Sequence, residues 1–132
     1  MKRSHYHTTY DLKYHLVLVT KYRKKCLSPE ILDYLEHVFR DLCEKWEIEL
    51  LEFGGEADHV HLLLNAHPSL EIGKLVNNLK TVSSRYTRKN HFDHINRYIW
   101  GGGLWTRAYY ISSVGGAPLS TIKKYIENQG KR

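Results

Sequence analysis

The chain has 132 residues, with 20 Lys or Arg against 14 Asp or Glu, so its formal net charge is +6 at pH 7. This length fits one domain, and 42% hydrophobic residues suffice for a core, which excludes tandem domains of ordinary size and a wholly disordered chain. The longest apolar run, Leu16–Val19, is far too short to span a bilayer, and the basic residues 1–5 lack the apolar stretch of a secretory signal. We therefore expect a cytoplasmic protein without a membrane partner. Its positive charge favours an anionic partner, of which nucleic acid is the commonest.

The cysteine content also limits the class of protein. Cys26 and Cys43 are too few for a disulfide scaffold, and they lack the spacing of a Cys-x-x-Cys metal clip. We interpret both as reduced thiols. Because the sequence contains no internal repeat and no low-complexity segment, we expect residues 1–132 to form a single domain.

The first half of the chain predicts a strand, a helix and a hairpin. Apolar residues occupy both alternating faces of Tyr14–Lys21, which favours a central strand. The segment Ser28–Glu30 has a serine N-cap and a proline at the first helical position, and apolar residues then recur at helical spacing as far as Trp46. Two strands, Glu47–Phe53 and His59–Asn65, flank a connection that contains two glycines, which is typical of a hairpin.

The second half predicts two helices and one more strand. A helix is expected over Leu70–Lys89, followed by a polar loop at Asn90–Arg97 and a strand rich in aromatic residues at Leu104–Ser113. Gly115–Pro118 breaks the chain, and a terminal helix follows at Ser120–Gln129. The core-facing stripe of the longer helix is predicted to be Ile72, Leu75, Val76, Leu79, Val82 and Tyr86, with Ser84 on its polar surface.

The order of these elements is β-α-β-β-α-β plus a terminal helix. This order predicts the α+β class and the ferredoxin-like (RRM-like) split βαβ fold, which has one four-stranded antiparallel sheet with two helices on one face. The other face and the edges of such a sheet are available to a ligand.

A His-x-His motif lies on the predicted third strand. Because side chains alternate between the two faces of a strand, His59 and His61 share one face while Val60, Leu62 and Leu64 point to the core. Two imidazoles at this spacing can share one metal ion. The alternative is that both are ordinary polar residues on a solvated sheet face.

The terminal helix carries Tyr125 and Gln129 one turn apart on the same face. The Gln oxygen is a usable ligand for a hard divalent cation. The phenol has an ordinary pKa near 10, so as a nucleophile it needs help from a metal or a base. The alternative is that Tyr125 belongs to a packing stripe together with Ile122 and Ile126.

Positive charges and aromatic rings cluster along the chain, a combination that suits single-stranded nucleic acid. The alternative is solvated charge beside an aromatic core. The basic residues are Lys21, Arg23, Lys24 and Lys25 after the first strand and Lys74, Lys80, Arg85, Arg88 and Lys89 on the long helix, and the aromatic ones are Trp100, Trp105, Tyr109 and Tyr110.

Three segments together resemble the single-tyrosine, HUH-type (TnpA) transposases of small bacterial and archaeal insertion sequences. They are His59-Val60-His61, the stretch Trp100–Trp105 leading into Tyr109–Gly115, and Tyr125–Gln129. The likeness extends over residues 5–130, and the combination of His-x-His with a downstream Tyr-x-x-x-Gln is far more specific than either motif alone.

The resemblance implies a DNA transposase that cuts and rejoins single-stranded insertion-sequence ends with subterminal hairpins. Tyr125 would be the nucleophile, forming a 5′-phosphotyrosine link and leaving a free 3′-hydroxyl. His59, His61 and Gln129 would hold a divalent ion, Mg²⁺ or Mn²⁺. The resemblance also implies a homodimer in which the tyrosine helix of one subunit can serve the metal site of the other.

The residues themselves are compatible with these implications. Transesterification conserves phosphodiester energy, and the sequence has no phosphate-binding loop, so we expect no nucleotide cofactor. The Gly115-Gly116 break would let the terminal helix move as a unit. The expected DNA contacts are Lys21, Arg23, Lys24, Lys80, Arg85 and Arg88.

Two other functions remain open at this point. A non-catalytic single-stranded nucleic-acid-binding module could use the same fold, but the chain lacks the aromatic signature string of RNA-recognition modules. A hydrolytic phosphoesterase would use paired histidines with water as nucleophile, and it usually needs a second histidine pair. The one other such pair, His5-Tyr6-His7, lies at the N-terminus.

Overall fold

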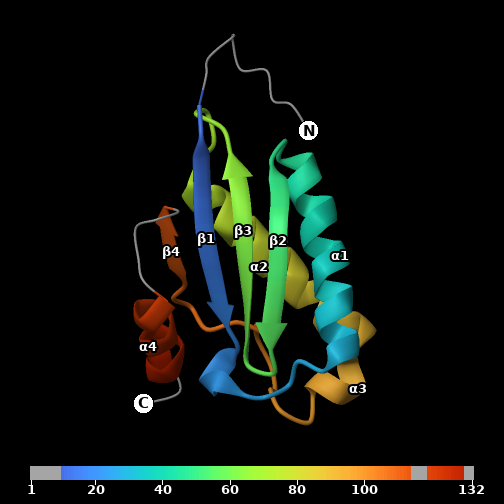
Figure 1. The fold of residues 1–132 in the computed structure, drawn as a ribbon. Helices are drawn as coiled ribbons and strands as arrows, with labels where there is room; N and C mark the ends of the chain where they lie inside the picture. Colours follow the sequence, from blue (N-terminus) through green and yellow to red (C-terminus); the bar gives the residue numbers. More distant parts are fainter. Residues whose placement is uncertain (1–9, 114–118, 130–132) are drawn as a thin grey trace.

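Four strands form one antiparallel sheet in the order β2-β3-β1-β4, in a computed structural model that describes residues 10–113 and 119–129 (Figure 1). This is the strand order of the ferredoxin-like split βαβ fold, and the predicted α+β class is confirmed. The elements are β1 (Leu12–Val19), a 3₁₀ turn η1 (Lys21–Arg23), α1 (Pro29–Lys45), β2 (Glu49–Glu56), β3 (His59–Ala66), α2 (Ile72–Asn90), α3 (Phe92–Ile95), β4 (Tyr110–Ser113) and α4 (Leu119–Gln129).

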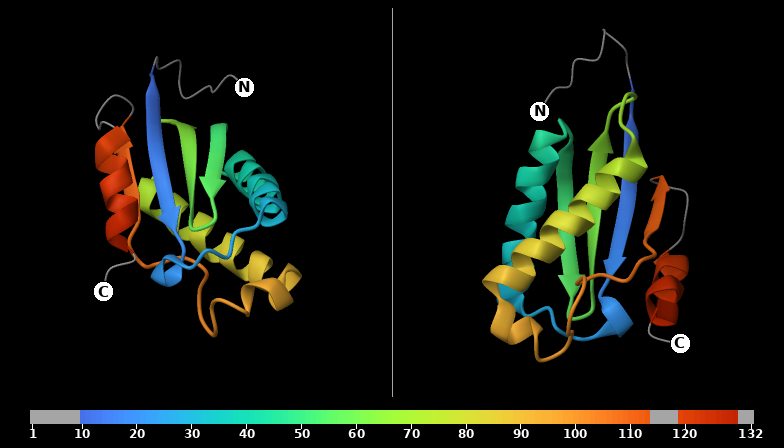
Figure 2. Two further views of the ribbon diagram at one scale, coloured as in Figure 1. Left: turned by 60° about the horizontal axis from the view of Figure 1, so that its bottom comes forward. Right: turned by 180° about the vertical axis from the view of Figure 1, so that it is seen from behind.

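The helices α1 and α2 cover one face of the sheet. Figure 1 shows α2 behind the strands, and the view from behind in Figure 2 shows it crossing in front of them. Helix α1 begins as predicted, because the Ser28 side chain accepts a hydrogen bond from the Ile31 amide at 3.2 Å. Its inner face buries Ile31, Leu35 and Phe39 completely or nearly so, and each such side chain contributes about 2 kcal/mol of hydrophobic stabilisation. The opposite face carries side chains of β1, β2 and β3, among them Val17, His59 and His61.

Strand β1 is central, as its apolar residues on both faces indicated. It pairs with β3 on one side and β4 on the other, and Leu16 through Val19 are all buried. The strand begins and ends two residues earlier than predicted. Thr20 closes it, because its amide donates to the Asp58 carbonyl at 3.0 Å.

The hairpin differs from its prediction in one respect. Gly54 and Gly55 lie inside β2 and pair with β3, so the turn itself consists of Ala57 and Asp58. Gly55 is required by close approach: a Cβ atom there would lie 2.6 Å from the His59 carbonyl oxygen. The glycines that resembled a turn are therefore part of the strand.

The fourth strand is shorter than the predicted Leu104–Ser113. Trp105 forms only an isolated bridge with Thr20, and the strand begins at Tyr110. The upstream segment is held by α2 instead, because Ser84 Oγ accepts from the Leu104 amide at 2.8 Å and Ser83 Oγ accepts from the indole of Trp105 at 2.9 Å.

These bonds also correct the predicted inner face of α2. Leu75, Val76 and Leu79 are buried as expected, but Tyr86 is 45% exposed. Ser83, Ser84 and Thr87 are buried in its place. Small hydroxyl side chains let the last turns of the helix approach the segment around Leu104 closely enough to bond it.

The predicted polar loop at Asn90–Arg97 contains a short helix, α3. Ile95 and Ile99 are buried there and join the core, and His94 Nε2 lies 2.9 Å from the Cys26 carbonyl oxygen. Cys26 and Cys43 are both buried, and neither forms a disulfide within the described residues. Among the residues that the structure describes, no helix combines the length and the apolar character needed to cross a membrane.

Candidate active site

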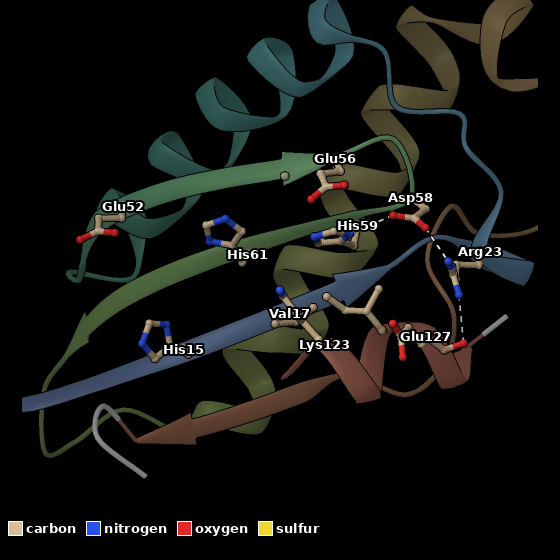
Figure 3. A pocket seen from close by; sticks show the side chains of 12 residues that line it. His15, Val17, Arg23, Glu52, Glu56, Asp58, His59, His61, Lys123 and Glu127 are labelled. Carbon is tan, nitrogen blue, oxygen red and sulfur yellow. Dashed lines mark hydrogen bonds and ion pairs between the residues drawn. The ribbon is translucent and has the colours of Figure 1, made fainter. Parts of the chain in front are cut away.

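A cavity of about 460 Å³ opens on the sheet face that α1 and α2 leave uncovered (Figure 3). Three strands form its floor, and one side of α4 forms its wall. Its lining comprises His15, Val17, Arg23, Glu52, Gly55, Glu56, Asp58, His59, His61, Lys123, Ile126 and Glu127.

The two motif histidines project into this cavity from β3, as the strand alternation predicted. Val60, Leu62 and Leu64 are fully buried on the opposite face. In the sheet, His59 pairs with Val19 of β1 on one side and with Glu56 of β2 on the other. Its ring lies on the open face (Figure 3).

The ring of His61 lies over a glycine of the neighbouring strand. In the register of the hairpin, His61 is opposite Gly54. A Cβ atom at Gly54 would lie 2.5 Å from His61 Nε2, which is closer than non-bonded atoms approach. The glycine therefore provides the space in which this imidazole rests.

The ring of His59 is fixed by a carboxylate. Its Nδ1 lies 2.9 Å from Asp58 Oδ1, and both side chains are nearly buried. A carboxylate only accepts hydrogen bonds, so Nδ1 of the neutral imidazole carries the proton and Nε2 keeps its lone pair. Carboxylate–histidine pairs of this kind orient metal ligands in many proteins.

The pKa values of Asp58 and His61 both lie below their ordinary values. Burial alone would raise the pKa of Asp58, but hydrogen bonds from His59 and Arg23 outweigh it and hold this pKa below its ordinary value. Desolvation, together with the nearby His59 and His15, lowers the pKa of His61. A lowered pKa favours the neutral form of His61, the form in which a histidine binds a cation.

Tyr125 and Gln129 are not brought into this cavity. The Tyr125 ring packs against Tyr110, with centroids 5.5 Å apart, and α4 presents Lys123, Ile126 and Glu127 to the cavity instead. The Tyr125 hydroxyl is buried without a hydrogen-bond partner in the described part of the chain, and burial raises its pKa.

The histidine pair by itself does not complete a metal site. Within residues 10–113 and 119–129, no three His, Cys, Asp or Glu side chains are grouped so that they could hold an ion. The expected Gln129 lies outside the lining of the cavity. The Gly115-Gly116 break and the pair His5-Tyr6-His7 both lie outside the described residues.

The predicted DNA contacts near η1 differ in their surroundings. Arg23 Nε lies 2.9 Å from Asp58 Oδ2, and Arg23 Nη1 donates to the Glu127 carbonyl at 3.0 Å, so its guanidinium bonds within the chain. Lys24 is exposed and Lys21 is half-buried.

On α2, the predicted contacts line two shallow clefts. Arg85 and Arg88 line both clefts, one of which also contains Phe92. Lys80 donates to the Arg107 carbonyl at 2.6 Å, and its ammonium lies 5.7 Å from the centroid of the Tyr109 ring. Burial, and then the charge of Arg107, lower the pKa of Lys80.

Sequence reasoning missed Asp58 and Gly54 as parts of the site. Asp58 directly precedes the first motif histidine, and that position was the one available signal. The role of Gly54 follows only from the register of the hairpin.

Comparisons with known proteins agree with this fold. Residues 8–129 match the family model described as "Transposase IS200 like". The chain is 37% identical to the ISDra2 transposase TnpA of Deinococcus radiodurans over 91% of this chain and 85% of that protein. It is 32% identical to the IS200 transposase of Salmonella typhimurium, over 93% of this chain and 80% of that protein.

Two solved structures are similar as well. A crystal structure assigned to a transposase of Deinococcus radiodurans R1 superposes with a TM-score of 0.85 at 37% identity, covering 98% of both chains. A REP-associated tyrosine transposase bound to a REP hairpin gives a TM-score of 0.55 at 9% identity, over 96% of this chain and 68% of that one, and therefore shares the fold alone. The family match and the relatives lead to one conclusion: this chain belongs to the IS200-like transposase family.

Proposed function

We propose that this transposase cleaves and rejoins single-stranded insertion-sequence ends through a tyrosine nucleophile. One observation supports it above all others: His59 and His61 enter the same cavity, Asp58 orients one of them, and the wall of that cavity is the helix that carries Tyr125. The reaction requires a phosphate-binding centre beside a nucleophile. In this proposal the histidine pair would form part of that centre, and α4 would bring the tyrosine to it.

His59 and His61 would be two of the ligands to a divalent cation, Mg²⁺ or Mn²⁺. Nε2 of His59 is free because Asp58 engages Nδ1, and the lowered pKa of His61 favours its neutral form. Gln129 would contribute a third, oxygen ligand. When bound, the ion would neutralise charge on the scissile phosphate.

In the proposed reaction, the Tyr125 oxygen forms a bond to phosphorus and the P–O3′ bond breaks. The phenol gives up its proton, and the departing 3′-oxygen gains one to become a free hydroxyl. A 3′-hydroxyl can then attack the phosphotyrosine and release the phenol. One phosphodiester replaces another, so no nucleotide cofactor is required.

We also propose that two copies of the chain share their sites. Tyr125 packs on Tyr110 rather than lining the histidine cavity of its own chain, and the histidine pair needs a further ligand. A second copy could supply both Tyr125 and Gln129. For DNA hairpins, the basic clefts along α2, with Arg85 and Arg88, are the proposed contact surface.

The test is an adduct assay with single-stranded DNA that carries the sequences flanking the gene. Incubation with Mn²⁺ should produce an SDS-stable protein–DNA adduct, and the Tyr125→Phe variant should produce none. Tyr110→Phe is the matched control. It removes the phenol oxygen from the ring against which Tyr125 packs, and the adduct should still form. Hairpin binding without any adduct would instead favour a non-catalytic binding module.

A further inference from the structure

Arg23 joins the helix that carries Tyr125 to the residue that orients His59. Its Nε bonds Asp58 Oδ2 at 2.9 Å and its Nη1 bonds the Glu127 carbonyl at 3.0 Å, as the dashed lines in Figure 3 show. We propose that Arg23 is a positioning residue that docks α4 along the histidine cavity and holds Asp58 against His59. This role differs from the DNA contact that the sequence predicted.

The turn that carries Arg23 is built in a rare conformation. Tyr22 and Arg23 both have φ of +56°, in the left-handed region that residues other than glycine seldom adopt. Such a conformation persists only where its surroundings fix it. Here the Thr20 hydroxyl donates to the Lys24 carbonyl at 2.7 Å, and the Arg23 amide donates to the Thr20 carbonyl at 2.8 Å.

The acceptor on α4 is one that helices leave open. Glu127 lies in the last turn of α4, where carbonyl groups have no partner further along the helix. A guanidinium at this end also meets the negative end of the helix dipole. Arg23 therefore satisfies a carbonyl that the helix itself cannot, and it does so with a charge of the favourable sign.

The other acceptor lies in the turn of the hairpin. The side chain of Asp58 is 11% exposed, and each of its two oxygens has a partner: Oδ1 faces His59 and Oδ2 faces Arg23. The planar guanidinium can bond Asp58 and Glu127 at once because its N–H groups point in fixed, different directions. A lysine ammonium has no such planar set of N–H donors in fixed directions.

A single side chain thus connects two parts of the site. Loss of Arg23 should loosen α4 and remove one of the two partners of Asp58. The docking of α4 is independent of the proposed function, whereas the effect on a metal at His59 rests on it. The two effects can therefore be measured separately.

The first experiment is hydrogen–deuterium exchange of the full chain without metal or DNA. In Arg23→Ala, amides of residues 123–129 should exchange about tenfold faster, the change expected when a charged hydrogen bond is lost, while α1 stays unchanged. Arg23→Lys should restore this protection only in part. Lys24→Ala, an exposed neighbour, should match the parent chain. Unchanged exchange in α4, or an equal rise in α1, would overturn the proposal.

The second experiment titrates Mn²⁺ and a DNA hairpin separately. Arg23→Ala should weaken Mn²⁺ binding several-fold, because it removes a partner of the carboxylate that orients His59. It should change hairpin affinity no more than Lys45→Ala does, an exposed lysine outside the expected DNA contacts. A large loss of hairpin affinity confined to Arg23→Ala would restore the DNA-contact assignment and overturn the positioning role. If the parent chain binds no Mn²⁺, the proposed function fails, while the exchange result still decides how α4 is docked.

Discussion

The imidazole of His61 rests in the space that Gly54 leaves on the adjacent strand, 2.5 Å from where a Cβ atom would be. Gly54→Ala should therefore push the ring away from its position and lower cleavage at least about tenfold, since displaced catalytic groups lose rate steeply. The measurement is the rate of adduct formation with Mn²⁺. Gly73→Ala is the matched control: a Cβ atom there meets nothing within 4 Å, so cleavage should be unchanged. Equal rates in both variants would show that the space at Gly54 is unimportant.

Removing the phenol oxygen of Tyr125 should separate stability from activity. Its hydroxyl is buried without a hydrogen-bond partner in the described part of the chain, which costs about 1–3 kcal/mol in typical proteins. Tyr125→Phe should therefore unfold at an equal or higher urea concentration while it forms no adduct. A loss of stability in this variant would mean that the hydroxyl is bonded in solution.

Two serines of α2 should be structural. Ser84→Ala would leave the Leu104 amide unpaired, and Ser83→Ala would do the same to the Trp105 indole, each at a cost of about 1–3 kcal/mol. Thr81→Ala on the exposed side of the helix is the control, with little expected effect. Urea unfolding of the three variants measures the difference, and a Thr81→Ala effect as large as the serine effects would contradict it.

Shared sites predict complementation between two inactive variants. A Tyr125→Phe chain retains the histidines, and a His61→Ala chain retains the nucleophile. If α4 of one copy serves the cavity of another, mixing the two should restore part of the cleavage. The assay compares each variant alone with the mixture at equal total concentration, and a mixture as inactive as its components would favour self-contained sites.

Alkaline pH should destabilise the fold through Cys26. Burial raises the pKa of this thiol from 9.0 to about 11, so the folded chain keeps a proton that the unfolded chain releases. The contribution of the thiol is intact below pH 9 and is lost as pH rises toward 11, by up to about 3 kcal/mol. Comparing urea unfolding at pH 8 and pH 10.5 for the parent and Cys26→Ala isolates it, and an identical pH dependence in both would refute the assignment.

The sequence predicted those elements whose local signals agreed with their packing. The Ser28 cap with its following apolar periodicity defined α1, and the alternation around His59 and His61 predicted which residues face the cavity. Both are short-range patterns that need no knowledge of a distant partner.

The other features depend on distant partners. Glycine inside a strand resembles a turn unless the ring lying over Gly54 is known. Likewise, Ser84 resembles a surface residue until the Leu104 amide is found against it. The distance between Tyr125 and the cavity could not be predicted either, because it depends on how α4 docks, and Arg23 from a turn a hundred residues earlier makes that contact.

The two-residue turn at Ala57 and Asp58 ties the geometry of the site to the length of a loop. An added or lost residue there, if taken up as a one-residue slip of β3, would turn His59 and His61 toward the core and the leucines toward solvent. It would also separate Asp58 from the ring that it holds. Insertions are usually tolerated in surface turns, but the length of this turn sets both the register of the hairpin and the positions of the two histidines, so it is constrained where other loops can vary.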